Sequence, residues 1–218
     1  MKRFMKGVFE LRLAFPKYTV TWDVDLVLPY LELLFPLDKL TLKELSYNLI
    51  MLIALSLGQR CQTLHHLTLP FMVLSSDNCV FDFVLDRGKH LAPIELQAYS
   101  DKRLCQCVVA AIRKYIHRTK DPFISYQKPY GPVSKSTAAQ WIWDVLHRAG
   151  QPGVDTSCFG AHSMLSASTS AAVVKGTPMD TVLKAAGWSG GAIFSKYYKK
   201  APVANMGQCL LDSYFKTT

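Results

Sequence analysis

The stretch that decides the fold runs from Ala161 to Tyr198 and reads AHSMLSASTSAAVVKGTPMDTVLKAAGWSGGAIFSKYY. It begins with His162, which opens a run of small residues with a helical pattern. A second helical run ends just before Trp188, inside a Gly-Trp-Ser step. Two tyrosines, Tyr197 and Tyr198, follow in a basic tail. Each short piece carries little information alone, so the order of the pieces is what points to a function.

An arginine far upstream, Arg60, completes a set of side chains suited to attack on a phosphodiester. A phenol with a pKa of ~10 is a weak nucleophile at neutral pH, and the phosphate that it attacks is already negative. Catalysis must therefore come from cations, and a guanidinium offers a planar fork of donors that matches phosphate oxygens. Such donors stabilise the charge that grows on a five-coordinate phosphorus.

The order of these residues resembles the catalytic domain of the tyrosine recombinases, the phage integrase-like family. The resemblance runs from about Thr21 to Tyr198. The Gly-Trp-Ser and Phe-x-x-Tyr-Tyr motifs of this sequence are most similar to those of recombinases from Crypton and DIRS mobile elements. The resemblance implies a mainly α fold with a small antiparallel β-sheet (α+β). It also implies DNA cleavage and rejoining through a phosphotyrosyl intermediate, without a metal or another cofactor, in DNA recombination or integration.

The resemblance also assigns roles to individual residues. Arg60 matches the first arginine of the family, and His162 matches the histidine of its His-x-x-Arg helix start. Trp188 stands in the later His/Trp position, where its indole can donate one hydrogen bond. The nucleophile is expected nine or ten residues after this tryptophan, which selects Tyr197 or Tyr198. We predict Tyr198 as the nucleophile and keep Tyr197 as the alternative.

Two positions depart from the family pattern. Leu165 stands where the second arginine belongs, and a neutral side chain cannot replace that charge. The family's hairpin lysine has no clear counterpart, although Lys89 or Arg87 in the turn between two strand-like runs can serve. Loss of one guanidinium contact at a reacting phosphate reduces the rate by several powers of ten. The chain is therefore predicted to be a weakened recombinase or, alternatively, an inactive DNA-binding or assembly module derived from one.

The same residues also have purely structural interpretations. Taken singly, Arg60 is more often a surface cation, His162 a helix-start residue and Trp188 a core aromatic. A third, weaker interpretation is a helical metabolic or protein-binding domain without a role on DNA. Absence of DNA binding at low salt would favour it.

Composition agrees with a nucleic-acid partner. The chain has 218 residues, a formal net charge of +9 and an isoelectric point near 9.3. Such a charge favours an acidic partner, most commonly a nucleic acid, bound in a salt-dependent way, and the family resemblance implies that this partner is double-stranded DNA. The six cysteines include no CxxC pair. Cys61 and His65 could share one helix face and supply two ligands of a metal site, but the sequence shows no second pair of ligands, so no metal site is predicted. No segment reaches the roughly 20 apolar residues that span a bilayer, which predicts no membrane contact.

Residues 1–20 are expected to be a linker remnant from a missing N-terminal core-binding domain, and residues 21–218 the catalytic domain. The family resemblance implies a homo-oligomer on DNA. The scattered cysteines and the lack of a signal-peptide core at residues 1–15 predict a nuclear location if the source is eukaryotic, otherwise a cytoplasmic one. The small residues after His162 permit close approach of neighbouring backbone or DNA.

Hydrophobic periods and caps predict two strands, Val80–Leu85 and Leu91–Ala98, and helices at Thr21–Leu34 (kinked at Pro29), Thr41–Leu57, Ser100–His117, Ser134–Ala149, His162–Lys175, Thr177–Ala186 and Met206–Phe215.

Overall fold

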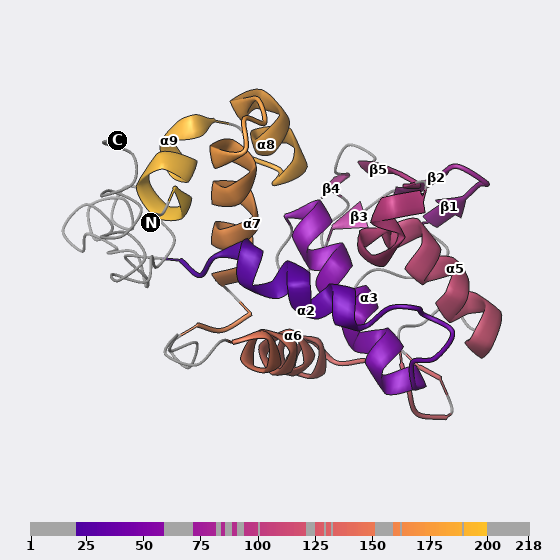
Figure 1. Cartoon of the computed structure of the whole chain (residues 1–218). Coiled ribbons are helices and arrows are strands. Elements are labelled where there is room, and N and C mark those ends of the chain that lie inside the picture. The colour runs from indigo at the N-terminus through magenta and orange to yellow at the C-terminus, as the bar shows by residue number, and fades with distance from the viewer. Residues whose placement is uncertain are drawn as a thin grey trace, which may run out of the picture.

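A computed structural model describes residues 21–58, 72–81, 84–85, 89–90, 94–99, 101–120, 125–128, 130–131, 133–150, 159–161, 163–188 and 190–199. Most of these residues are helical, and a small antiparallel sheet lies at one end of the molecule, next to α5 (Figure 1). The helices α7, α8 and α9 lie at the opposite end (Figure 1). The predicted α+β class is therefore confirmed.

The central element is α3 (Leu42–Leu57), which has buried residues on all of its faces. Its start is the predicted capping box: Thr41 Oγ1 accepts from the Glu44 amide at 3.2 Å, and Glu44 accepts from the Thr41 amide at 2.8 Å. Helices α5 (Val108–Thr119), α6 (Lys135–Ala149) and α7 (Ser163–Val174) pack around it. A helix enclosed in this way needs apolar residues all round, which explains the run that the sequence shows there.

The first helical region is interrupted close to the predicted proline. A 3-10 turn, η1 (Val24–Leu26), is capped by Asp23 and leads into α2 (Val27–Leu33). Pro29 therefore lies in the first turn of α2, where its missing N–H is not needed. The predicted break near Pro29 is thus the change from the 3-10 turn η1 to the α-helix α2, which begins at Val27.

The helix predicted at Ser100–His117 is wrong in its first part. Asp101–Gln106 forms a 3-10 segment, η3, with non-helical angles at Arg103. Cys107 then adopts an extended conformation, and its Sγ accepts from the Ala110 amide at 3.4 Å, so α5 begins only at Val108. Apolar spacing alone does not reveal that a buried thiol will cap a new helix. Helix α6 follows the predicted helix Ser134–Ala149 closely: Ser134 caps it by accepting from the Thr137 amide, and Trp141 is buried as predicted.

The sheet contains the predicted hairpin in two pieces. Strand β2 (Asn78–Phe81) pairs with β5 (Ile94–Gln97), and β3 (Val84–Leu85) pairs with β4 (Lys89–His90), both antiparallel. The register shifts by one residue between the two ladders, because Phe81 pairs with Ile94 but Val84 with His90. Strand β1 (Met72–Leu74) joins the outer side of β2 and was not predicted.

The last described elements build the end of the molecule that carries the tyrosines. Helix α7 is followed by α8 (Met179–Ala185), and Gly187, two residues after the end of α8, has the left-handed conformation with a φ of 69°. A single helical turn, α9 (Gly191–Ile193), continues into the π-helical turn η4 (Phe194–Tyr198). The helix predicted at Met206–Phe215 lies outside the described residues. None of the helices in the described ranges is long and apolar enough to cross a membrane.

Candidate functional site

Trp188 and Tyr198, two of the predicted site residues, lie against each other. Their ring centroids are 4.6 Å apart with an interplanar angle of 33°. The same indole also contacts the buried ring of Phe194, at 5.6 Å and 40°. Phe194 and Tyr198 begin and end the turn η4, so one tryptophan side chain packs against both ends of the element that carries the tyrosine. These contacts give a physical reason for the spacing of Trp188, Phe194 and Tyr198.

The backbone of Tyr198 is held from the other side by α7. Its carbonyl oxygen accepts hydrogen bonds from Ser166 Oγ at 2.9 Å and Ser170 Oγ at 2.7 Å. These two serines are four residues apart and therefore share one face of the helix. The π-helical turn closes with the Lys199 amide donating to the Phe194 carbonyl at 2.8 Å. π-Helical turns are rare and are found often at functional sites.

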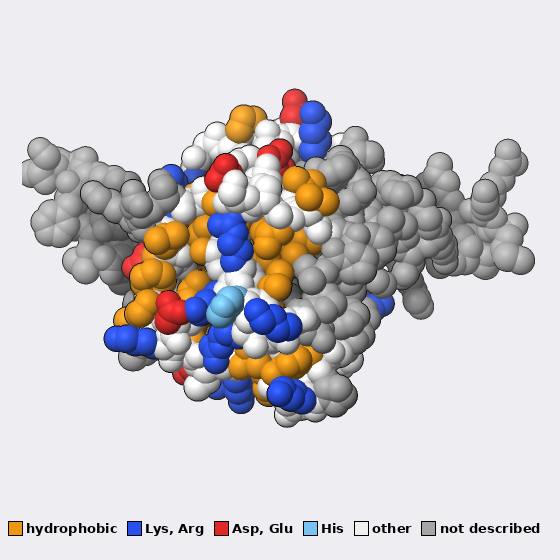
Figure 2. Space-filling model, turned by 90° about the vertical axis from the view of Figure 1, so that its right-hand side faces the viewer, with side chains coloured by type: hydrophobic (Ala, Val, Ile, Leu, Met, Phe, Trp, Pro, Cys, Tyr) orange, Lys and Arg blue, Asp and Glu red, His pale blue; other side chains and the backbone are white. Residues whose placement is uncertain are grey.

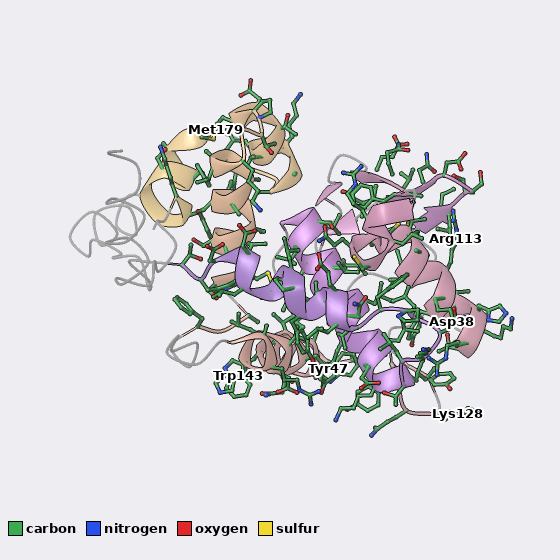
Figure 3. The ribbon with its side chains drawn as sticks, in the orientation of Figure 1. Asp38, Tyr47, Arg113, Lys128, Trp143 and Met179 are labelled. Carbon is green, nitrogen blue, oxygen red and sulfur yellow. The ribbon has the colours of Figure 1, made fainter. Side chains whose placement is uncertain are left out.

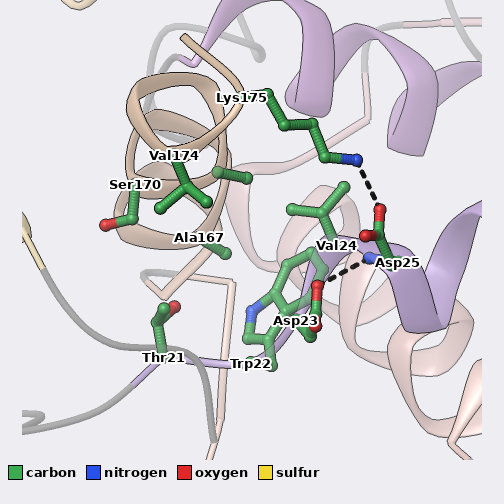
Figure 4. A pocket seen from close by; sticks show the side chains of 10 residues that line it. Thr21, Trp22, Asp23, Val24, Asp25, Ala167, Ser170, Val174 and Lys175 are labelled. Carbon is green, nitrogen blue, oxygen red and sulfur yellow. Dashed lines mark hydrogen bonds and ion pairs between the residues drawn. The ribbon is translucent and has the colours of Figure 1, made fainter. Parts of the chain in front are cut away.

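Helix α7 is itself fixed near both ends by the first described segment of the chain. At its start, Trp22 Nε1 donates to Ser163 Oγ at 3.0 Å, within a buried contact. Just past its end, Lys175 Nζ lies 2.6 Å from Asp25 Oδ1 (Figure 4). A small cavity of about 100 Å³ between the two contacts is lined by Thr21 from this segment and by Ser170 from α7 (Figure 4). The helix that bonds to Tyr198 is thus held near both of its ends.

Leu165, the residue at the position of the second family arginine, is buried in α7 with 3% of its surface exposed. Its backbone carbonyl accepts from Thr169 Oγ1 at 2.5 Å. A guanidinium at this depth would need ionic or hydrogen-bonding partners, whereas a leucine needs only packing. The side chain present here therefore serves the interior and supplies no charge to a phosphate.

The remaining predicted site residues are described in part or not at all. Arg60 and His162 lie outside the described residues. Lys89 lies on strand β4, where its backbone pairs with Leu85, and Tyr197 lies within η4; their side chains are outside what the structure describes.

The elements next to Arg60 and His162 do meet. Gly58, which ends α3 with a φ of 55°, lies against Ser168 and Thr169 of α7, and α7 begins at Ser163. A Cβ atom added at Gly58 would lie 3.4 Å from Thr169 Cγ2. The end of α3 and the turn η4 thus both contact α7. The close approach of neighbouring backbone that this small-residue helix permits is confirmed at Gly58.

The most basic helix, α5, makes fold contacts with its cations. Arg113, labelled in Figure 3, donates to the carbonyls of Ser75 and Ser76 in the turn between β1 and β2. Lys114 pairs with Asp38. Arg118 donates to the Leu40 carbonyl at 2.6 Å. Figure 2 views this end of the molecule and shows a band of Lys and Arg side chains between hydrophobic ones. Arg113, Lys114 and Arg118 therefore hold α5 to its neighbours.

Two shifted pKa values belong to the interior. Burial, together with the hydrogen bond to Asp144 at 2.8 Å, raises the pKa of Tyr47 to about 12. Tyr47 belongs to α3, and its side chain contacts Trp141 and Asp144 on α6 (Figure 3). Burial also raises the pKa of the Cys79 thiol to about 12. Within the described ranges, no group of three or more His, Cys, Asp or Glu side chains is arranged to hold a metal ion.

Comparison with known proteins identifies the fold. The chain superposes on XerH recombinase bound to a difH substrate before cleavage with a TM-score of 0.62, at 10% identity, covering 89% of this chain and 54% of that chain. For XerA recombinase the TM-score is 0.60 at 12% identity, with 93% and 65% covered. For a lambda integrase dimer bound to a COC' core site it is 0.58 at 15% identity, with 87% and 50% covered.

At these identities the likeness concerns the fold, which is that of the tyrosine recombinase catalytic domain. The chain spans 50% to 65% of the length of these three structures. No protein-family model and no curated protein matches the sequence.

Proposed function

We propose that this chain binds double-stranded DNA and acts, weakly, as a tyrosine recombinase, with Tyr198 as the nucleophile. The observation that carries the proposal is the contact between Trp188 and Tyr198, 4.6 Å between centroids, within a fold shared with DNA-bound recombinases. In this proposal the Tyr198 oxygen attacks phosphorus and expels the 5′ hydroxyl of the next nucleotide. A hydroxyl of the partner strand later attacks the same phosphorus and releases the tyrosine, so neither a metal nor a nucleotide is consumed.

The proposal gives the other residues supporting roles. Arg60 steadies the phosphate oxygens, with Lys89 as a second cation, and His162 with the Trp188 indole donates to the same oxygens. Tyr197 is the alternative nucleophile. Donors in fixed positions are effective here because they need no rearrangement as negative charge grows.

A trapping experiment tests the proposal. The protein is incubated with a nicked duplex whose cleavage releases a short strand that cannot rejoin, and a covalent protein and DNA adduct is sought on a denaturing gel. We expect a small amount of adduct from the unmodified chain and none from Tyr198→Phe, with Tyr197→Phe as the matched control that keeps it. Loss of adduct in Tyr197→Phe alone would identify Tyr197 as the nucleophile.

The buried Leu165 favours a second candidate function, a DNA-binding or assembly module that no longer cuts DNA. Leu165→Arg distinguishes the two candidates, with Leu165→Met as a control of similar volume that adds no charge. If the missing guanidinium limits the rate, the arginine variant should form adduct at least about 100-fold faster. Thermal unfolding of each variant shows whether the buried arginine is tolerated. Abundant adduct from the unmodified chain would reject the idea of a weakened site.

The absence of adduct from every variant, together with salt-sensitive DNA binding, would establish the second candidate. The absence of DNA binding even at low salt would reject both. Within the first candidate we further propose a homo-oligomer on DNA, an origin in a Crypton- or DIRS-type mobile element, and a nuclear location if the source is eukaryotic. The Gly187-Trp188-Ser189 and Phe194-x-x-Tyr197-Tyr198 motifs support the mobile-element origin.

A further inference from the structure

We propose that Ser166 and Ser170, whose hydroxyls both donate to the Tyr198 carbonyl, form a clamp that positions the turn η4. The inference builds on the proposed function, because it concerns how the candidate nucleophile is held. Ser166 and Ser170 are positioning residues in this scheme, since they act through the backbone of Tyr198.

The geometry of the clamp is specific. Two hydroxyls from successive turns of α7 donate to one carbonyl oxygen, which has two lone pairs to accept them. Both serines are buried, with 6% and 4% of their surfaces exposed, so water competes poorly for these bonds. They connect segments that lie 32 and 28 residues apart in the chain. The clamp is therefore a tertiary contact and does not belong to either helix alone.

The turn η4 needs such support. It consists of one π-helical turn after the three-residue helix α9, and isolated turns of this length are not stable by themselves. Trp188 packs against its rings, and the serines hold its backbone. These two contacts together fix both the position of the backbone and the plane of the Tyr198 ring. A small displacement of η4 relative to α7 would therefore move the Tyr198 phenol.

The other hydroxyls of α7 provide an internal comparison. Ser168 is also buried, but its Oγ faces the carbonyl of Leu165 in its own helix, at 3.4 Å. Ser168→Ala therefore removes a buried hydroxyl from the same helix without touching the tyrosine turn. Serine to alanine is a mild change in a helix interior, because alanine is the better helix former.

Hydrogen exchange of backbone amides tests the clamp without requiring any DNA chemistry. In Ser166→Ala/Ser170→Ala, we expect amides of the segment 194–199 to exchange about tenfold faster or more. The Lys199 amide, which closes the π-helical turn, is the most informative of them. Amides of α3 and α6 should keep their rates, and Ser168→Ala should match the unmodified chain throughout. Ser170→Thr, which keeps a hydroxyl, should restore slow exchange in the Ser166→Ala background.

Unchanged exchange in 194–199 of the double variant would overturn the clamp. So would a uniform increase over the whole molecule, since that would make the serines general stabilisers of the fold. The exchange result is independent of whether any adduct forms, so failure of the proposed function cannot imitate failure of the clamp. If adduct does form, the double variant should form it more slowly at saturating DNA while DNA affinity stays unchanged.

Discussion

At the scale of single residues, Tyr47 shows how burial affects the pH dependence of stability. Its pKa is raised to about 12 because it is buried and because its phenol donates to Asp144. The neutral phenol is therefore favoured in the folded state, and this contribution is complete below pH ~10. Between pH ~10 and ~12 the unfolded chain loses the proton while the folded chain keeps it, so stability falls.

The first prediction follows from that difference. Replacement of Tyr47 by Phe removes the titrating group, so the free energy of unfolding should decline less steeply over this range than in the unmodified chain. The difference in slope should approach about 1.4 kcal/mol per pH unit. Denaturant unfolding at several pH values above 9 measures it. Parallel pH profiles for the two proteins would contradict the assignment.

Gly58 gives a second prediction at this scale. Its φ of 55° is a conformation that residues with a Cβ atom rarely adopt, and an added Cβ would lie 3.4 Å from Thr169 Cγ2. Gly58→Ala should therefore destabilise the protein by about 1 to 2 kcal/mol. Thermal unfolding provides the measurement, with Gly190→Ala as the control, because Gly190 has an extended backbone and open space where a Cβ atom would lie. Equal stabilities of the two variants would be the contrary result.

At the scale of elements, α5 illustrates how a basic helix is used within a fold. Lys114 pairs with Asp38, and Arg118 donates to the Leu40 carbonyl, so the helix is tied to the segment before α3. Arg113 ties it to the turn between β1 and β2. The sequence shows these cations as a charge run, but their partners lie 37 to 78 residues away.

A third prediction distinguishes support of the fold from binding of DNA. Arg118→Gln should lower the free energy of unfolding by about 1 kcal/mol, because a charged donor to Leu40 is lost. Its affinity for duplex DNA should be unchanged within error. A loss of DNA affinity without a loss of stability would mean that Arg118 belongs to the binding surface.

At the scale of the whole molecule, a net charge of +9 predicts that DNA binding weakens as salt increases. We expect the logarithm of the association constant to fall linearly with the logarithm of salt concentration. The exposed Lys199 directly follows Tyr198, so Lys199→Gln should reduce the slope by about 1, the value for one phosphate contact. Arg118→Gln should leave the slope unchanged. Fluorescence anisotropy with labelled duplex provides both values, and equal slopes for all three proteins would show that Lys199 contacts no phosphate.

The sequence by itself determined the features that neighbouring residues encode. The Thr41 capping box, the helix that begins at Ser134, the apolar run of α3 and the antiparallel hairpin are local patterns, and each appears in the structure as predicted. The order of Trp188 and the tyrosines also predicted the fold.

Only the tertiary structure decided how these pieces meet. The contact of Trp188 with both ends of η4, the two serine bonds to Tyr198 and the buried bond from Trp22 to Ser163, 141 residues away, depend on how helices pack. The start of α5 at Val108 depends on a buried thiol in the same way. Periodicity and caps arise from short-range forces along the chain, whereas these contacts arise from close packing between distant segments, which no local pattern specifies.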